Sequence, residues 1–204
     1  MSDPDQSTGP DAETLSVYDR KAAEYRDLTA RSKIDPDLAR FLKALPAGSD
    51  VLDLGCGPGA AAAHMAAAGH RVTATDASPE MVKLAGAHPG VTARLATFDD
   101  VDAVAAYDAI WANFSLLHAP RAEMPRHLAA LRRALRPGGL FHIGMKTGTG
   151  EARDALGRRY TYYTEDELSG LLRAAGFTPT ASRRGKDTGL DGTVAPWVTI
   201  AADG

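Results

Sequence analysis

The sequence predicts an α/β protein built on a doubly wound, mostly parallel sheet. Short apolar runs that are typical of buried strands alternate with helical segments, and this order favours parallel strands joined by right-handed crossovers. A glycine-rich turn directly follows the first of these strands. The chain has 204 residues, of which 44% are hydrophobic and 24% charged. This composition fits one globular domain with a sizeable core.

The N-terminal part is predicted to be a tail followed by helices. Residues 1–13 are polar and lack an apolar period, which is typical of a disordered tail. A helical pattern then runs from Thr14 to Leu45, and within it Asp35 and Pro36 fit an N-cap and a first helical position. The predicted units are therefore a tail over 1–13 and one domain over 14–204, with N-terminal helices in 14–47 and an α/β core in 48–204.

Apolar runs in the core predict the strands, and cap residues predict where helices begin. Ser78 fits an N-cap, and Thr164 with Glu167 fits a capping box. We expect strands over 51–54, 71–75, 91–96, 107–112 and 140–145. We expect helices over 59–68, 79–87, 124–135 and 165–176. The late strands 178–184 and 197–202 have no helix between them, so they should form an antiparallel hairpin at the sheet edge.

Charge and cysteine content exclude several classes. The formal net charge is −3, too small to favour a nucleic-acid partner. The single cysteine, Cys56, excludes an internal disulfide and a zinc site of several thiolates. The histidines lack the spacing of metal ligands, so no metal is expected. Without a signal-peptide pattern or a long apolar run, we expect a cytoplasmic protein with no membrane segment.

The run from Asp53 to Gly59, Asp-Leu-Gly-Cys-Gly-Pro-Gly, predicts a ligand site. Its glycines allow a tight turn and let a ligand approach the main chain, and the following helix N-terminus offers free N–H groups. Asp76 lies at the end of the next strand, 21 residues after Gly55. A carboxylate there can accept hydrogen bonds from both hydroxyls of a ribose, so a nucleoside-containing ligand is expected at the carboxyl ends of the strands.

Two ligand classes compete for this loop. Residues 55–60 also satisfy the dinucleotide pattern G-x-G-x-x-A, which would indicate a nicotinamide cofactor. Asp53, however, would face a pyrophosphate unfavourably but could orient the cationic ammonium of S-adenosylmethionine (SAM). The loop also follows helices that could form a lid, and no second nucleotide-binding half succeeds it. These observations favour SAM.

Residues 51–59, Val-Leu-Asp-Leu-Gly-Cys-Gly-Pro-Gly, resemble the first motif of class I SAM-dependent methyltransferases. Residues 135–140, Leu-Arg-Pro-Gly-Gly-Leu, resemble the turn that these proteins carry before the fifth strand. Asp76 matches their ribose acid, and 107–112 match their fourth strand. The resemblance covers about residues 14–204 and implies a seven-stranded sheet with an antiparallel last strand, SAM as cofactor and methyl transfer by in-line displacement.

The resemblance also implies the cofactor-binding residues. They are Asp53, Gly55, Cys56, Gly57, Gly59, Asp76, Ala77, Met81, Thr97, Phe98, Asp99 and Asn113. Many relatives have an acidic residue directly after the third strand that touches the adenine amine, and here two alternatives stay open. Either Asp99 acts from a shifted position, or Thr97 and backbone groups do so while Phe98 packs on the ring. Cys56 is interpreted as a small residue lining the pocket rather than as a nucleophile.

Candidates for the acceptor side follow the fourth and fifth strands or lie in the N-terminal helices. His118 is a candidate base or substrate contact, or else a hydrogen-bonded surface histidine. Tyr18 and Tyr25 lie seven residues apart on one predicted helix face, where they either reach the cofactor from a lid or simply pack. The basic and tyrosine-rich segment 146–163 could hold an anionic or aromatic acceptor, or form a surface loop.

The acceptor is expected to be a small molecule. Residues 113–116, Asn-Phe-Ser-Leu, do not fit the Asn-Pro-Pro-aromatic pattern of nucleobase-methylating relatives, and no appended nucleic-acid module is visible. One rival is an RNA- or protein-directed methyltransferase, because residues 121–204 carry an excess of basic side chains. The other is a non-catalytic protein that binds SAM or S-adenosylhomocysteine (SAH). The acceptor atom and the oligomeric state stay open.

Overall fold

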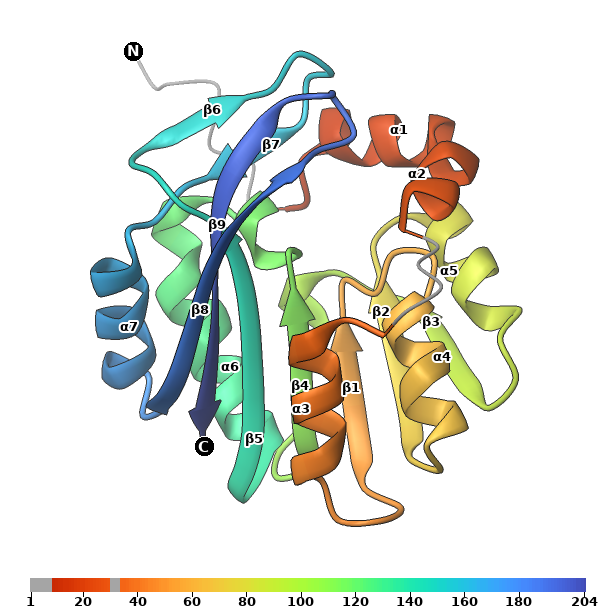
Figure 1. Ribbon diagram of the computed structural model, residues 1–204, viewed down its shortest axis with the longest axis vertical. Coiled ribbons are helices and arrows are strands. Elements are labelled where there is room, and N and C mark those ends of the chain that lie inside the picture. The colour runs from red at the N-terminus through yellow and green to blue at the C-terminus, as the bar shows by residue number, and fades with distance from the viewer. Residues whose placement is uncertain (1–8, 30–33) are drawn as a thin grey trace.

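The computed structural model describes residues 9–29 and 34–204 (Figure 1). Within them the chain forms a seven-stranded sheet in the order β3-β2-β1-β4-β5-β9-β8 and a two-stranded sheet of β6 and β7. The strands are β1 (Asp50–Leu54), β2 (Arg71–Asp76), β3 (Val91–Leu95), β4 (Tyr107–Asn113), β5 (Leu135–Lys146), β6 (Glu151–Arg153), β7 (Arg159–Thr161), β8 (Thr178–Thr188) and β9 (Val194–Asp203). The α-helices are α1 (Ala12–Arg20), α2 (Ala22–Thr29), α3 (Pro36–Ala44), α4 (Ala60–Ala67), α5 (Pro79–Gly86), α6 (Met124–Ala134) and α7 (Glu165–Ala174).

The sheet confirms the predicted α/β class. Strands β1 to β5 run parallel, whereas the last strand, β9, is antiparallel to both β5 and β8. The hairpin of β8 and β9 therefore closes one edge, as predicted, although both strands are longer than expected. The chain adds β2 and β3 on one side of β1 and then crosses to add β4 on the other side. Loops at the carboxyl ends of β1 and β4 diverge at this crossing, which is where open α/β sheets bind ligands.

Local capping fixes three helix starts where the sequence predicts them. The side chain of Asp35 caps α3, that of Ser78 caps α5, and Thr164 forms a capping box with Glu167 at α7. Each cap satisfies backbone N–H groups that the first helical turn leaves without partners. These interactions join residues that are close in sequence, so the sequence pattern alone locates them.

The structure differs from the predicted tail at residues 11–13. Helix α1 begins at Ala12, and the carboxylate of Asp11 caps it by accepting from the backbone N–H of Thr14 at 2.9 Å. Asp11 also forms an ion pair with Arg153 at 2.7 Å, and the guanidinium holds the pKa of this carboxyl well below its usual range. A partner 142 residues away in sequence thus orders this segment. Residues 1–8 of the predicted tail lie outside the described residues.

The core has one cluster on each face of the sheet. Phe41 of α3 and Met65 of α4 pack against β1 and β2 on one face. Leu128 of α6 and Leu168 of α7 pack against β4, β5 and β9 on the other. Because both faces are covered at the centre of the sheet, β1 and β4 are buried over most of their length. No helix among residues 9–29 and 34–204 is long and apolar enough to cross a membrane.

Strands β6 and β7 were not predicted. Each has three residues, which is too short for an alternating pattern to stand out in the sequence. In the chain they follow β5 and precede α7. They pair antiparallel with each other and lie beside α1 above the sheet (Figure 1). The turn between them contains a buried ion pair, in which Nη2 of Arg158 lies 2.6 Å from a carboxylate oxygen of Asp154. This hairpin carries part of the tyrosine-rich segment to the end of the sheet where the glycine loop lies.

Candidate active site

The glycine loop after β1 adopts backbone conformations that only glycine tolerates without strain. Gly55 has φ +67° and Gly59 has φ +83°, both in the left-handed region. A Cβ atom at Gly55 would lie 2.3 Å from Cβ of Ser115, and one at Gly59 would lie 2.7 Å from Cα of Ala85. The loop is therefore packed against the segment after β4 on one side and against α5 on the other. These contacts leave its main chain bare toward the cavity.

Asp76, the last residue of β2, is held by the loop. One carboxylate oxygen accepts from the backbone N–H of Gly57 at 2.9 Å, and the other accepts from that of Ser78 at 2.9 Å. Burial raises the pKa of this carboxyl, while the backbone hydrogen bonds act in the opposite direction. The side chain lines the cavity in front of the glycine loop, so its carboxylate is fixed where the sequence predicts a ribose acid.

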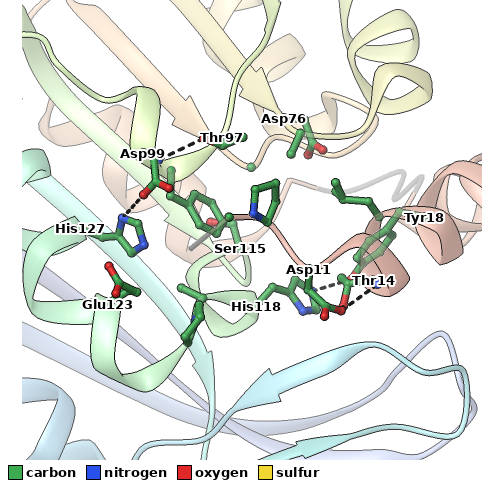
Figure 2. Close-up of a pocket in the computed structure, with 18 of the residues that line it drawn as sticks. Asp11, Thr14, Tyr18, Asp76, Thr97, Asp99, Ser115, His118, Glu123 and His127 are labelled. Atoms are coloured by element: carbon green, nitrogen blue, oxygen red, sulfur yellow. Dashed lines mark hydrogen bonds and ion pairs between the residues drawn. The ribbon is translucent and has the colours of Figure 1, made fainter. Parts of the chain in front are cut away.

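A cavity lies between this loop, helix α1 and the ends of β2, β3 and β4 (Figure 2). We call it the glycine-loop cavity. Of the predicted site residues, those lining it are Tyr18, Tyr25, Gly55, Gly57, Asp76, Ala77, Met81, Thr97, Phe98, Asp99 and His118. Its lining also includes residues that the sequence did not name as individual cofactor or catalytic candidates, namely Gly9, Pro10, Asp11, Thr14, Leu15, Phe114, Ser115, Ala119, Pro120, Glu123, Arg126 and His127.

Four predicted cofactor residues do not line this cavity: Asp53, Cys56, Gly59 and Asn113. Asp53 shares a strand face with Val51 of the α4-side core, so its side chain lies beneath α4 rather than in the cavity. Asn113 accepts a hydrogen bond from Nε2 of His142 at 3.0 Å, which engages its amide oxygen at the sheet. Asp53 does not line the glycine-loop cavity, and its contact with the amino-acid end of SAM stays a prediction.

The burial of Asp53 has an electrostatic consequence. Its side chain is 3% exposed, and its Oδ2 has no hydrogen-bond partner among the described residues. Burial, with the nearby negative charge of Asp76 adding to it, raises the pKa of Asp53 to about 7. Burial likewise raises the pKa of the Cys56 thiol, so this thiol is neutral and unreactive at neutral pH.

At the far end of the cavity, Asp99 is already engaged. Its Oδ1 accepts from Nη2 of Arg126 at 2.6 Å and lies 3.7 Å from Nδ1 of His127. The ring of Phe98 meets His127 edge-on, with the centroids 5.7 Å apart. Phe98 and Asp99 thus both reach the cavity, so the structure is compatible with both predicted ways of reading an adenine.

The two predicted lid tyrosines come together, but on separate helices. The helix that the sequence predicts as continuous breaks at Lys21, which leaves Tyr18 on α1 and Tyr25 on α2. Their rings meet edge-on with centroids 5.4 Å apart. A Cβ atom at Gly57 would contact the Tyr25 ring at 3.4 Å. The lid therefore lies directly over the glycine loop.

His118 belongs to a chain of hydrogen bonds that determines its protonation. Its Nδ1 lies 2.6 Å from the carbonyl oxygen of Arg159, and since a carbonyl only accepts, Nδ1 carries the proton. In the neutral ring Nε2 then accepts, and the Tyr18 hydroxyl donates to it at 2.9 Å. Arg158 donates to the same hydroxyl oxygen at 3.1 Å. Burial lowers the pKa of His118 to about 4, so the ring is neutral at physiological pH.

A second cavity of about 410 Å³ lies on the other side of the lid tyrosines. We call it the hairpin cavity, because strands β8 and β9 supply one wall. It is lined by Tyr18, Tyr25, Leu28, Thr29, Phe114, Leu117, Lys146, Arg158, Tyr160, Asp187, Thr188, Gly189, Leu190, Ala195 and Trp197. Tyr18, Tyr25 and Phe114 line both cavities. Its volume lies within the range of small-molecule sites.

Phe114 stands at this shared wall in a strained conformation. Its φ of +56° is unusual for a residue with a side chain, and its backbone N–H donates to the carbonyl of Gly144 at 3.0 Å. Strain of this kind costs on the order of 1–3 kcal/mol and is most common at functional sites. A single sequence gives no signal for a positive φ at Phe114. Trp197 of β9 was likewise missed, since its strand is distant from β4 in sequence.

Neither cavity holds a metal site. Among the described residues, no group of three or more histidine, cysteine, aspartate and glutamate side chains could hold a metal ion. The donor set around the glycine loop instead suits an uncharged ribose and an adenine ring. It offers a carboxylate, bare backbone, and the ring of Phe98. Ser115 adds a buried hydroxyl without a partner in the described part of the chain.

Comparison with known proteins places this geometry in a family. Residues 51–139 match the model of a methyltransferase domain. The chain is 33% identical over 153 residues to a ubiquinone biosynthesis O-methyltransferase of Xanthomonas axonopodis, in a match that spans 64% of this chain and 63% of that relative. It is 30% identical over 175 residues to a trans-aconitate 2-methyltransferase of Deinococcus radiodurans, spanning 83% of this chain and 67% of the relative.

A solved structure shows the same fold with ligands bound. It is the 1,6-didemethyltoxoflavin-N1-methyltransferase of Burkholderia thailandensis with 1,6-didemethyltoxoflavin and SAH. The two structures superpose with a TM-score of 0.78 at 30% identity, and the match covers 94% of this chain and 87% of that one. The glycine loop, the acid at the end of β2 and the seven-stranded sheet with its antiparallel last strand agree with these similarities. The chain therefore belongs to the class I SAM-dependent methyltransferases, a family whose cofactor is SAM.

Proposed function

We propose that this protein transfers a methyl group from SAM to a small-molecule acceptor. The wall shared by the two cavities carries this proposal. Tyr18, Tyr25 and Phe114 line both, so a donor in the glycine-loop cavity and an acceptor in the hairpin cavity would be neighbours.

Different residues of the glycine-loop cavity would bind different parts of the cofactor. The carboxylate of Asp76 would accept from the ribose hydroxyls, and the bare main chain at Gly55 and Gly57 would lie against the amino-acid end. The Ser115 hydroxyl is a further donor there. Met81, Thr97, Phe98 and Asp99 would enclose the adenine.

Methyl transfer from SAM mainly requires that the acceptor be aligned with the methyl group and that water be excluded. When bound, SAM supplies an electrophilic methyl group on a positively charged sulfur. The lid tyrosines and Phe114 would hold the acceptor in line with that group and close the site to solvent. In the displacement, an acceptor lone pair forms the new bond to carbon while the carbon–sulfur bond breaks.

The predicted role of His118 as a base is less well supported than a positioning role. Both of its ring nitrogens are engaged, one by the Arg159 carbonyl and the other by the Tyr18 hydroxyl. Its lowered pKa makes it a weak base at neutral pH. We propose that His118 fixes the Tyr18 ring at the boundary between the two cavities.

A small-molecule acceptor is supported by cavity size and by the relatives. A cavity of about 410 Å³ accommodates a metabolite-sized ring system. The names of the similar proteins refer to ubiquinone biosynthesis, to trans-aconitate and to 1,6-didemethyltoxoflavin, and ubiquinone, trans-aconitate and 1,6-didemethyltoxoflavin are small molecules.

Calorimetry and labelling test the proposal. We expect the protein to bind SAM and SAH in isothermal titration and to show no binding of NADH. Incubation with methyl-labelled SAM and a small-metabolite extract should yield a labelled small product that mass spectrometry identifies. Binding of NADH without binding of SAM would refute the proposed cofactor. Label found only in RNA or protein would refute the proposed acceptor class.

A further inference from the structure

The hairpin cavity contains a lysine ammonium that has no ion-pair partner in the described part of the chain. Lys146 is the last residue of β5, is partly buried, and lines this cavity. Within residues 9–29 and 34–204, no carboxylate oxygen lies within 4.0 Å of its Nζ. Nζ instead lies 3.8 Å from the centroid of the Tyr160 ring. A cation in this position keeps only part of its hydration and keeps its capacity to bind an anion.

The other charges around this cavity already have protein partners. Arg158 is paired with Asp154 at 2.6 Å, and both side chains are almost fully buried. Asp187 accepts from Nε1 of Trp197 at 3.1 Å. Asp191 accepts from the backbone N–H of Thr193 at 3.2 Å, and its charge acts on Lys146 from beyond ion-pair distance. Among the described residues no carboxylate contacts the Lys146 ammonium at ion-pair distance, although the carboxylate of Asp187 lines the same cavity.

The walls around this cation are aromatic and apolar. Tyr160 lies under the ammonium, while Phe114 and Trp197 meet edge-on with centroids 6.2 Å apart. Leu28, Leu117, Leu190 and Ala195 add to the apolar lining. Flat walls of this type favour stacking with a planar ring, and the ammonium at one end favours a negative group on that ring.

We infer that the hairpin cavity binds a planar aromatic or heteroaromatic acceptor as its anion, with the ammonium of Lys146 against the negative group. This inference rests on the proposed function and names the substrate class of the same site. The anion brings its own lone pair, which forms the bond to the methyl carbon as the carbon–sulfur bond breaks and its electron pair stays on sulfur. No proton has to move, which agrees with the engagement of both nitrogens of His118.

Binding of matched probes tests this inference independently of catalysis. The probes are 4-nitrophenolate and benzoate, with 4-nitroanisole and benzamide as neutral counterparts of similar shape. Affinities are measured by isothermal titration at pH 8 with the protein saturated in SAH. The variants are Lys146→Met, which keeps the stem without the charge, and Lys146→Arg, which keeps a charge. Lys43→Met, on the exposed side of α3 and outside both cavities, is the matched control.

We expect at least one anionic probe to bind the unmodified protein more tightly than its neutral counterpart. Lys146→Met should weaken that anion about tenfold or more while changing the neutral probe less than threefold, because an unpaired charge–anion contact is lost. Lys146→Arg should restore most of the affinity, and Lys43→Met should have no effect. The inference would be overturned if Lys146→Met lost the same affinity for the anionic probe as for its neutral counterpart. It would also be overturned if the unmodified protein bound neither anion more tightly than its neutral counterpart. Failure of SAH to bind the unmodified protein would instead overturn the proposed function.

Discussion

The hydroxyl of Tyr18 donates to Nε2 of His118 across 2.9 Å, and this hydrogen bond joins helix α1 to the segment after β4. Two further contacts fasten the same helix. Asp11 pairs with Arg153 beside β6, and Asp19 accepts from the Ser78 hydroxyl at 2.5 Å. Helix α1 over the glycine loop is thus held at both of its ends. Its polar contacts, rather than an apolar core of its own, determine where it lies.

Replacing Tyr18 with phenylalanine should loosen this lid. The change leaves Nε2 of His118 without its donor and removes an acceptor from Arg158, which should lower the free energy of unfolding by about 1–3 kcal/mol. Urea unfolding measures this loss, and hydrogen exchange of α1 should rise selectively. Tyr107→Phe is a suitable control, since no hydrogen bond is found for its hydroxyl in the described residues. Equal effects of the two changes would contradict the assigned contact.

Removing one charge of the buried ion pair between Asp154 and Arg158 should strongly lower the free energy of unfolding. Asp154→Asn leaves a guanidinium that is 2% exposed without its counter-charge, which should cost about 3–5 kcal/mol of stability. Adding Arg158→Met should recover part of this loss, so a double-mutant cycle should show strong coupling. The exposed pair of Glu80 and Lys83, at 3.6 Å, provides the control. Glu80→Gln should change the unfolding free energy by less than about 0.5 kcal/mol.

Gly55 and Gly170 should respond in opposite ways to alanine. At Gly55 a Cβ atom would overlap the Ser115 side chain, and φ of +67° is unfavourable for alanine. We expect Gly55→Ala to reduce stability by at least about 1–2 kcal/mol and to abolish SAH binding. Gly170 lies within α7 with open space around it, so Gly170→Ala should stabilise by up to about 1 kcal/mol. Thermal unfolding and SAH titration distinguish these outcomes.

Asp76 should matter for the cofactor more than for folding. Asp76→Asn removes the charge that strengthens hydrogen bonds to the ribose, and SAH should bind with a loss of about 1–3 kcal/mol, that is, about 5- to 150-fold. Asp102→Asn, exposed and outside the cavities, should bind SAH like the unmodified protein. An unchanged affinity in Asp76→Asn, measured by calorimetry, would rule out the ribose contact.

Stability should fall in mild acid because His118, His142 and His127 are buried and burial lowers the pKa of each. Burial lowers the pKa of His118 to about 4 and that of His142 to about 3, from an ordinary value of 6.5. A folded-state pKa below the unfolded value gives stability that is present above pH 6.5 and is lost as pH falls toward the folded value. Each group can contribute up to about 1.4 kcal/mol per pH unit in that window. Asp53, whose pKa is raised to about 7, acts in the opposite direction, so the net loss is smaller than the histidines alone would cause.

Urea unfolding at pH 7.5, 5.5 and 4.5 checks this expectation. His118→Gln should be less stable than the unmodified protein at pH 7.5, and the difference should shrink as pH falls. His64→Gln, an exposed position on α4, should follow the slope of the unmodified protein. A constant difference between His118→Gln and the unmodified protein at all three values would show that His118 does not titrate as assigned.

How far the site could be predicted differs from residue to residue. Gly55, Gly57 and Asp76 lie at the cavity as expected, because the strand–glycine–helix pattern and the end of the next strand place them at the same edge of the sheet. Asp53 has the expected position in the chain but faces α4. Its strand is buried on both sides, so apolar alternation could not indicate which face its side chain takes.

The sequence by itself determined the sheet class, because the alternation of strand and helix patterns indicates it. It also determined the helix caps at Asp35, Ser78 and Thr164 and the glycine bend, because these depend on contacts between residues a few positions apart. The tertiary structure alone decided that Arg153 orders the segment at Asp11. It alone also brought Lys146, Tyr160 and Trp197 around one chamber. Such contacts form only when strands distant in sequence end at the same edge of the sheet, and the buried surface that brings them together is not encoded in any short stretch of the chain.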